Sequence, residues 1–250
     1  MPVLPCEAVY AGAMLIQVAP LYILICSSVR SHHKSAMEGL DGSAELEEIL
    51  ASGTFFTADW FSYALDNFKE IKRILGSADN ILEIGCHEGM STCWMLQELL
   101  SDTGTITCID PWANEPLSAF NDDVVPENRI IERIFRSNTD KARKPNQTIN
   151  VMPELSYNAL AQLISQGQRY DFIYVDGSHD ADAVLTDACM CFGLLKPGGI
   201  MLFDDYLWPY ATDALSRPKM SIDAFVNMFT NRINVGIMNY QLSIQKKPKE

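Results

Sequence analysis

The chain has 250 residues, of which 48% are hydrophobic and 20% are charged. This composition predicts one large folded domain or two small ones with a sizeable buried core, and it excludes disorder over most of the length. Nineteen Lys and Arg residues against 32 Asp and Glu residues give a formal net charge of −13. Because so acidic a surface repels phosphate backbones, we expect no nucleic-acid partner, whereas a divalent-cation site is compatible with the charge.

Cysteine usage indicates a reducing compartment. The seven cysteines are an odd number, they are scattered along the chain, and no Cys-x-x-Cys pair occurs. This pattern argues against a disulfide framework and against a zinc site. We therefore expect free thiols and a cytoplasmic location.

An apolar segment precedes the first sequence of globular composition. Residues 8–29 are almost entirely apolar, and the positive side chains near them come after the run, from Arg30 to Lys34. The run is just long enough to span a bilayer, and this charge placement would leave the rest of the protein on the cytosolic side. The alternative is a disordered extension ahead of a natural start at Met37. We expect residues 1–36 to be an anchor or such an extension and residues 37–250 to be the functional domain. Any membrane contact would be confined to residues 8–29.

Helical patterns come first in this domain. A short acidic helix is expected over residues 44–50, and a longer helix over residues 57–74. Thr57 is a suitable N-cap for the longer helix, and Gly76 is a suitable stop.

From residue 81 onward, short apolar runs alternate with helical patterns. The runs predict strands at 81–84, 105–109, 148–151, 172–175 and 200–203, with helices between them at 91–100, 127–136, 157–165 and 181–195. A helix at 222–229 then precedes two strands, 232–238 and 240–245, with almost no loop between them. Near-continuous apolar strands separated by helices are typical of a parallel sheet covered on both faces. The predicted fold class is α/β: a doubly wound, mostly parallel, seven-stranded sheet with an antiparallel strand from a C-terminal hairpin.

A glycine-containing turn follows the first strand of this sheet. The sequence from Glu83 runs Glu-Ile-Gly-Cys-His-Glu-Gly and leads into Ser91 and a helix. Gly85 and Gly89 would let the backbone approach a ligand closely, and the helix start presents free amides. A tight strand-to-helix connection without a ligand explains the glycines equally well. The turn is not the dinucleotide fingerprint, because His87 stands where a second glycine should be.

Asp110 ends the second strand, 27 residues after Glu83. An acid at this point of a doubly wound sheet is placed to accept hydrogen bonds from ribose hydroxyls. A solvated aspartate at a strand end is the alternative, but the two acids occur together and in the order that a nucleotide-type site requires.

Three further acids follow the two strands near the end of the sheet. Asp176 ends one strand, and Asp204 and Asp205 end the next, so adjacent parallel strands would bring three carboxylates to one edge. Like charges at short range need protons or a cation, and oxygen ligands suit Mg²⁺ or another hard divalent ion. Helix capping by Asp176 and Ser178 is the alternative, but it leaves the second pair unexplained. His179, next to these acids, is a candidate general base.

These motifs together resemble a class I S-adenosylmethionine-dependent methyltransferase. The turn from Glu83 through Gly85 to Gly89 is similar to the first motif of that class, Asp110 to its ribose-binding acid, and residues 195–199 (Leu-Lys-Pro-Gly-Gly) to the turn before its fifth strand. The resemblance implies the Rossmann-like methyltransferase fold and S-adenosylmethionine as a cofactor. It also implies that the cofactor is bound by Glu83, Gly85, Gly89, Ser91 and Asp110.

Within that class, the acids and the histidine resemble one group in particular. Asp176-Gly177-Ser178-His179 with Asp204-Asp205 is similar to the metal-dependent O-methyltransferases that act on sugar hydroxyls of macrolide and aminocoumarin compounds, and to cephalosporin-hydroxylase-like proteins. This resemblance implies that Asp176, Asp204 and Asp205 hold Mg²⁺, that His179 is the base, and that the partner is a small hydroxylated acceptor.

Two other functions are compatible with the same fold. A nucleotide-type binding or regulatory domain without catalysis would keep the pocket but would not need the intact set of acids and His179. An NAD-dependent oxidoreductase is disfavoured by the missing dinucleotide fingerprint. The sequence leaves the acceptor, the need for metal and the oligomeric state open.

Overall fold

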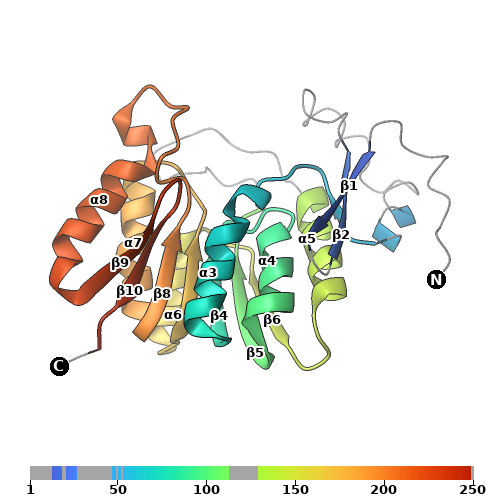
Figure 1. Ribbon diagram of the computed structural model, residues 1–250, viewed down its shortest axis with the longest axis horizontal. Helices are drawn as coiled ribbons and strands as arrows, with labels where there is room; N and C mark the ends of the chain where they lie inside the picture. The colour runs from blue at the N-terminus through green and yellow to red at the C-terminus, as the bar shows by residue number, and fades with distance from the viewer. Residues whose placement is uncertain are drawn as a thin grey trace.

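The computed structural model describes residues 13–18, 21–26, 47–48, 50–51, 53–112 and 129–248. Its centre is a seven-stranded sheet in the order β6-β5-β4-β7-β8-β10-β9 (Figure 1). The strands from β4 to β8 are parallel to one another, whereas β10 is antiparallel to both β8 and β9. The predicted fold class is therefore confirmed. The bounds are β4 (Ala78–Ile84), β5 (Leu100–Ile109), β6 (Thr148–Met152), β7 (Tyr170–Val175), β8 (Leu195–Phe203), β9 (Ile233–Met238) and β10 (Leu242–Lys246).

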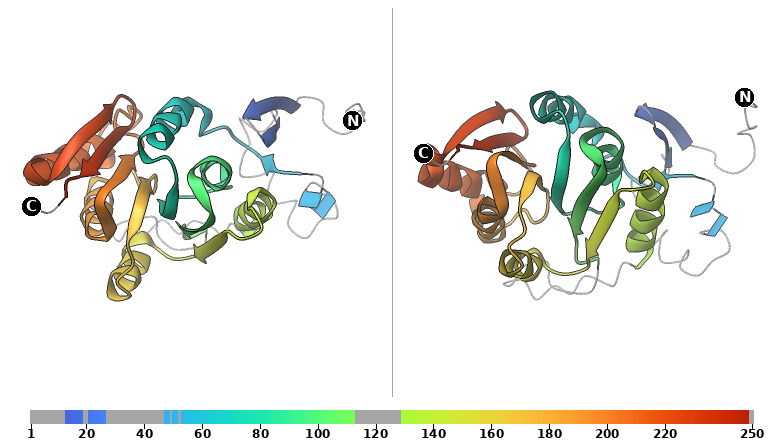
Figure 2. Two further views of the ribbon diagram at one scale, coloured as in Figure 1. Left: turned by 60° about the horizontal axis from the view of Figure 1, so that its bottom comes forward. Right: turned by 90° about the horizontal axis from the view of Figure 1, so that it is seen from below.

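Helices cover both faces of the sheet (Figure 2). One layer holds α3 (Leu65–Leu75), α4 (Met90–Trp94) with a π-helical turn after it (Met95–Leu99), and α5 (Arg129–Ala142). The other layer holds α6 (Ser156–Ser165), α7 (Ala181–Leu194) and α8 (Pro218–Phe229).

The alternation of side chains along the strands divides the core in two. In β7, Phe172 and Tyr174 pack in the cluster with α3, α4 and α5, whereas Ile173 and Val175 pack in the cluster with α6, α7 and α8. Successive strand residues point to opposite faces, so a continuous apolar strand serves both layers. This two-sided burial is the physical reason that the sequence shows apolar runs instead of an alternating pattern.

The segment before α3 differs from the prediction. The helix does not begin at Thr57: a 3-10 turn at Ser62–Ala64 leads into α3, which begins at Leu65. Asp59 Oδ1 accepts the amides of Phe61 and Ser62, at 3.2 and 2.8 Å, and so caps this turn. Thr57 is not an N-cap, because its amide and its hydroxyl both donate to Glu88. The predicted stop at Gly76 is confirmed by a positive φ of 72° and by its amide bond to the Lys72 carbonyl.

The described part of the apolar N-terminal run is two strands. β1 (Ala13–Val18) pairs antiparallel with β2 (Leu21–Cys26), which pairs in parallel with the two-residue strand β3 (Phe55–Phe56). Among the described residues, no helix combines the length and the apolar character needed to cross a membrane. The predicted boundary between residues 36 and 37 lies outside the described residues and stays a prediction.

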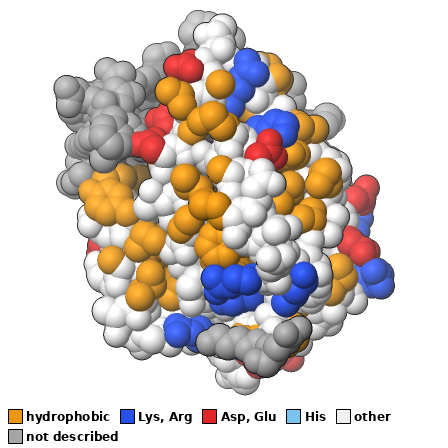
Figure 3. All heavy atoms as spheres, turned by 90° about the vertical axis from the view of Figure 1, so that its left-hand side faces the viewer, with side chains coloured by type: hydrophobic (Ala, Val, Ile, Leu, Met, Phe, Trp, Pro, Cys, Tyr) orange, Lys and Arg blue, Asp and Glu red, His pale blue; other side chains and the backbone are white. Residues whose placement is uncertain are grey.

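The sheet ends at β9, on the side of the molecule that carries α8. Met228 on α8 and Val235 and Met238 on β9 are exposed there. Figure 3 shows that apolar side chains on this side are interspersed with charged ones.

Candidate functional site

The predicted site residues lie at the carboxyl edge of the central strands. Hydrogen bonds continue from strand to strand past the strand ends: the amide of Gly85 donates to the Ile109 carbonyl at 2.9 Å, that of Asp176 to Ile84 at 2.8 Å, and that of Asp204 to Val175 at 2.9 Å. The strands β4, β5, β7 and β8 therefore deliver their following residues to one place, as expected for a doubly wound sheet.

Gly85 lies in direct contact with the end of β7. Its φ is +80°, and a Cβ atom built on it would lie 1.8 Å from the Asp176 carbonyl oxygen. Gly89 has a φ of +83°, and a Cβ there would lie 2.9 Å from the Phe135 ring. The chain thus requires both glycines for its own packing, and the contact at Gly85 brings the turn at 85–89 next to the acids of β7 and β8.

Glu83 and Ser91, both predicted to bind a cofactor, are hydrogen-bonded to each other. The Glu83 side chain is fully buried and accepts the hydroxyl groups of Ser91 and Thr92, which lie in the first turn of α4. Burial raises the pKa of Glu83 to about 7. The buried carboxylate thereby fixes the start of α4 relative to the end of β4.

Asp110 shapes the turn through its backbone amides. Its Oδ2 accepts the amides of Cys86 and His87, each at 2.9 Å, and its Oδ1 accepts the amide of Trp112 at 3.0 Å. A carboxylate offers about four acceptor positions, so Oδ1 keeps one for another donor. The Trp112 indole, in turn, donates to the His87 carbonyl at 2.9 Å.

Backbone strain is concentrated at this edge. The described residues other than glycine that have positive φ are His87 (45°), Trp112 (36°) and Asp205 (55°). Each follows a strand end of the site, and such conformations persist only where the surroundings hold them. Here hydrogen bonds to Asp110 hold His87 and Trp112 in place, and hydrogen bonds to the Asp205 side chain hold Asp205 in place.

Asp176, Asp204 and Asp205 form a compact acidic cluster, as predicted. One oxygen from each carboxylate lies within 4.8 Å of the others, and Asp204 is buried. Within the described ranges, the only ion-pair partner of these acids is His179. Burial, and then the charges of Asp204 and Asp205, raise the pKa of Asp176 well above its usual range. A cluster with this surplus of negative charge is suited to a cation.

Neutral hydroxyl and amide groups surround the acidic cluster. Asp204 Oδ2 accepts the hydroxyl of Tyr63 at 2.7 Å, the side-chain amide of Gln241 at 3.0 Å and the hydroxyl of Tyr174. The Tyr174 hydroxyl also lies 3.1 Å from Asp176 Oδ2, and Tyr240 donates to Asp205 Oδ1 at 2.7 Å. Burial and the charge of Asp204 raise the pKa of Tyr63, so its hydroxyl keeps its proton as a donor.

Sequence reasoning did not find these four residues. Strand alternation places Tyr174 on the same side of β7 as Asp176, and this signal could have identified it. No local signal marks Tyr63 or Gln241, which are 141 and 37 residues away from Asp204 in the sequence.

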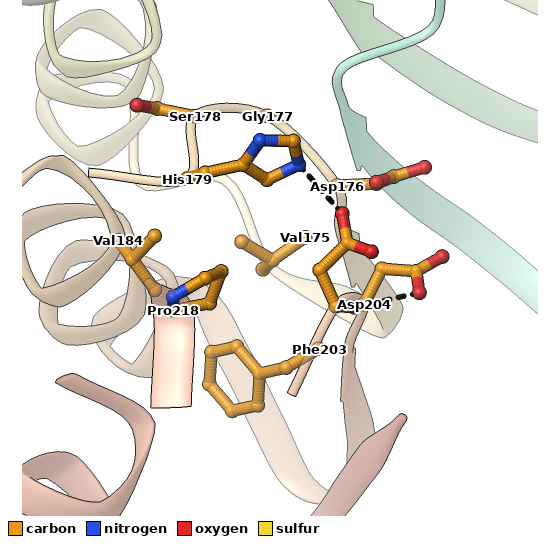
Figure 4. Close-up of a pocket in the computed structure, with 10 residues that line it drawn as sticks. Val175, Asp176, Gly177, Ser178, His179, Val184, Phe203, Asp204 and Pro218 are labelled. Atoms are coloured by element: carbon orange, nitrogen blue, oxygen red, sulfur yellow. Dashed lines mark hydrogen bonds and ion pairs between the residues drawn. The ribbon is translucent and has the colours of Figure 1, made fainter. Parts of the chain in front are cut away.

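His179 lies beside the acids and lines a small pocket formed by the ends of β7 and β8, the residues that follow them, and Val184 and Pro218 from α7 and α8. Its Nε2 is 2.7 Å from Asp205 Oδ2, and 41% of its side chain is exposed. Figure 4 shows the ring turned toward the acids, above apolar side chains that include Val175, Phe203 and Pro218. The Trp208 ring stacks on the imidazole at 4.3 Å between centroids, so the imidazole is held from one side by an acid and from another by an aromatic face.

Tyr206, the basic residues near α5 and the cysteines do not take part in the acidic cluster. Tyr206 is buried against α8, where its hydroxyl donates to Asp223 at 2.9 Å. Basic side chains on α5 and directly after it form surface ion pairs, as is typical of a solvated helix face: Arg133 with Glu47, Arg136 with Glu132, Arg143 with Asp140 and Lys144 with Asp102. The cysteines at 86, 93, 108, 189 and 191 are free thiols.

Comparison with known protein families bears on the fold and on the site. A family model described as a methyltransferase domain matches residues 82–206. This range covers half of the chain and contains every residue predicted for the site, from Glu83 to Asp205. No curated protein matches the sequence.

Several solved structures share the fold. An O-methyltransferase from Bacillus cereus, solved with S-adenosylhomocysteine, has 20% sequence identity and a TM-score of 0.51, over 88% of this chain and 94% of that one. TomG from Streptomyces achromogenes, an O-methyltransferase of tomaymycin synthesis solved with S-adenosylmethionine, has 17% identity and a TM-score of 0.55, over 84% and 90% of the two chains. MycE of the mycinamycin pathway, solved with Mg and S-adenosylhomocysteine, has 15% identity and a TM-score of 0.50, over 81% of this chain and 54% of that one.

Proposed function

Because this chain belongs to the family of methyltransferase domains and is a class I S-adenosylmethionine-dependent methyltransferase, we propose that its methyl acceptor is a hydroxyl group of a small molecule or a sugar. The observation that carries the proposal is the compact cluster of Asp176, Asp204 and Asp205, with His179 hydrogen-bonded to it at a pocket. A hydroxyl must lose a proton to be methylated, and this arrangement offers a base next to a site for a cation.

The donor would bind against the turn at residues 85–89. Gly85 and Gly89 give this turn its shape, while Glu83 and Ser91 hold the start of α4 in place. Asp110 would accept the ribose hydroxyls, for which its Oδ1 keeps an acceptor position. The contact between Gly85 and the Asp176 carbonyl puts this donor site next to the acidic cluster.

The acidic cluster fits a divalent cation such as Mg²⁺. Its donor atoms are carboxylate oxygens, which hard cations prefer, and no Lys or Arg in the described ranges forms an ion pair with it. When bound by Asp176, Asp204 and Asp205, such an ion would lower the pKa of the acceptor hydroxyl. Tyr63 and Gln241 would orient Asp204 as a ligand, because both donate hydrogen bonds to it.

His179 is the proposed general base. Its Nε2 faces the acids, 2.7 Å from Asp205 Oδ2, so this nitrogen would accept the proton of a hydroxyl bound beside them (Figure 4). S-adenosylmethionine would supply the methyl group from its sulfonium and would be left as S-adenosylhomocysteine, while His179 would take the proton that the acceptor hydroxyl loses. Asp205 stabilises the resulting charged imidazole, and stacking on Trp208 keeps the ring oriented.

Aromatic side chains beside His179 favour a ring-shaped acceptor. Tyr210 packs against Trp208 at 5.7 Å between centroids and is 80% exposed, and Tyr63, on the other side of the acids, is 53% exposed. Aromatic side chains are typical of sites that bind flat or cyclic molecules. We further propose a reducing compartment such as the cytoplasm, which is consistent with the free thiols.

Transfer of a labelled methyl group from S-adenosylmethionine to a panel of phenols, catechols and sugars tests the reaction. We expect transfer that needs Mg²⁺, and a loss of about 100-fold or more in Asp204→Asn and in His179→Ala. Asp182→Asn, at an exposed position on α7, is the control. Unchanged transfer after chelation and in Asp204→Asn would refute the role of the metal.

Calorimetry separates this function from the two alternatives. S-adenosylmethionine and NAD are titrated into the protein with and without Mg²⁺. Binding of S-adenosylmethionine without transfer to any acceptor would favour the non-catalytic domain. Tight binding of NAD with no response to S-adenosylmethionine would favour the oxidoreductase and overturn the proposal.

A further inference from the structure

Glu88 is a buried acid in the turn at residues 85–89 that the proposed reaction does not use. It is 2% exposed. Its Oε2 accepts the amide of Thr57 at 2.7 Å, and its Oε1 accepts the hydroxyl of Thr57 at 2.6 Å. A buried carboxylate is costly unless it is well hydrogen-bonded, so these two bonds account for the position of the side chain.

Asn138 on α5 binds the same part of the chain. It is fully buried, its side-chain amide donates to the Phe55 carbonyl at 2.7 Å, and its Oδ1 accepts the Phe55 amide at 2.8 Å. The same amide group lies 3.0 Å from the carbonyl of Glu88. Two buried polar side chains, Glu88 and Asn138, therefore hold residues 55–57 against the turn.

Residues 55–63, which we call the crossing segment, run from this anchor to the acidic cluster. The Trp60 ring packs at a tilt against His87 of the turn, at 4.6 Å between ring centroids. Tyr63 donates to Asp204 and packs edge-on against Tyr240 at 5.3 Å. The segment thus contacts the proposed donor site and the acidic cluster within a few residues.

The crossing segment carries two partly exposed aromatic rings. Trp60 is 59% exposed and Tyr63 is 53% exposed, although both are held on their inner sides. Asp59, directly before Trp60, accepts the amides of Phe61 and Ser62, so the two rings are joined by a hydrogen-bonded turn. A shift of Thr57 would therefore move both rings relative to the turn and the acids.

We propose that Glu88 is a positioning residue for methyl transfer, which acts by holding Thr57 so that Trp60 forms a wall of the donor site. The proposal rests on the proposed function, since it takes the turn at residues 85–89 as the donor site. Glu88 hydrogen-bonds to Thr57 and is too buried to face the donor directly. Its effect on donor binding passes through the crossing segment.

Three variants test this inference by two measurements that need no acceptor. Glu88→Gln, Trp60→Ala and the double variant are compared for the Kd of S-adenosylhomocysteine, by calorimetry, and for hydrogen exchange of residues 55–63. We expect Glu88→Gln to weaken binding about tenfold and to speed exchange in this segment, while β7 stays protected. If Glu88 acts through Trp60, the double variant binds no more than about twofold weaker than the worse single variant.

The control is Glu98→Gln, which removes a surface ion pair with Lys72. Faster exchange with an unchanged Kd would overturn the proposal, because Glu88 would then hold the segment without serving binding. Full additivity of the two substitutions, or a weaker Kd without faster exchange, would also overturn it. If Glu88→Gln does not fold, Thr57→Val removes the hydroxyl bond to Glu88 and keeps the amide bond, and it carries the same expectations at smaller size. Failure of the unaltered protein to bind S-adenosylhomocysteine would instead refute the proposed function.

Discussion

Asp187 is a buried acid on α7 with an incompletely satisfied carboxylate. It is 2% exposed, and its Oδ1 has no hydrogen-bond partner among the described residues. Burial raises its pKa to about 6. Because the folded state then binds the proton more tightly than the unfolded state does, the stability contributed by this group is full below the unfolded pKa near 4. It declines as the pH rises toward 6.

Asp187→Asn should remove the loss of folding stability that accompanies ionisation of this buried acid. We expect the variant to gain stability relative to the unaltered protein at pH 8, by about 2 to 3 kcal/mol, and to gain little at pH 4. Urea unfolding of both proteins at the two pH values measures the difference. An equal difference at both values would mean that Asp187 is not protonated preferentially in the folded state.

Two glycines give opposite expectations for the same substitution. Gly85→Ala places a Cβ 1.8 Å from the Asp176 carbonyl at a φ of +80°, whereas a Cβ at Gly193, which is exposed on α7, meets nothing within 4 Å. We expect Gly85→Ala to destabilise the protein by more than about 3 kcal/mol, and Gly193→Ala to stabilise it by about 0.5 to 1 kcal/mol. Thermal unfolding compares them. A tolerated alanine at residue 85 would show that the β4 and β7 ends are less closely packed.

The junction of β4 and α4 depends on hydroxyl groups that meet a buried acid. Thr92→Val keeps the shape of the side chain but removes its donor to Glu83, while Thr92→Ser keeps the donor. We expect the valine variant to lose about 1 to 3 kcal/mol of stability, because a buried carboxylate oxygen loses its partner. The serine variant should lose less. Equal losses, measured by urea unfolding, would mean that the methyl group and not the hydroxyl is the important contact.

The elements show which features a sequence can predict. The strands β4 to β8 were predictable because apolar runs of strand length report burial on both faces, and Asp176, Asp204 and Asp205 followed from where those runs end. The start of α3 was not predictable, because the amide and hydroxyl of Thr57 donate to Glu88, 31 residues away, and do not cap a helix. A capping pattern is local, and it cannot reveal a competing partner that only the folded chain brings near.

At the scale of the whole molecule, the net charge of −13 should influence the choice of acceptor. An acidic surface attracts cations and repels anions over about 10 Å at 0.1 M salt and over longer distances at lower salt. The test uses three catechols that differ in the charge of one substituent: dopamine, 4-methylcatechol and 3,4-dihydroxyphenylacetate. The expected order of kcat/KM, or of competitive inhibition, is cation, neutral, anion, with a spread of a few-fold that shrinks as salt is added. A preference for the anion would indicate a basic acceptor subsite.

The hydrogen bonds from Tyr240 and Gln241 bear on the order in which the site forms during synthesis. Gln241 follows Asp204 by 37 residues, and Tyr240 follows Asp205 by 35. A nascent chain that has emerged only as far as Asp205 holds all three acids and His179 but neither of these donors. Until the β9–β10 hairpin docks, the acids face one another with fewer donors to hold them. Assembly of the site is therefore coupled to the arrival of the last strand of the sheet, so a chain stalled before the hairpin would carry the ligands without a preorganised site.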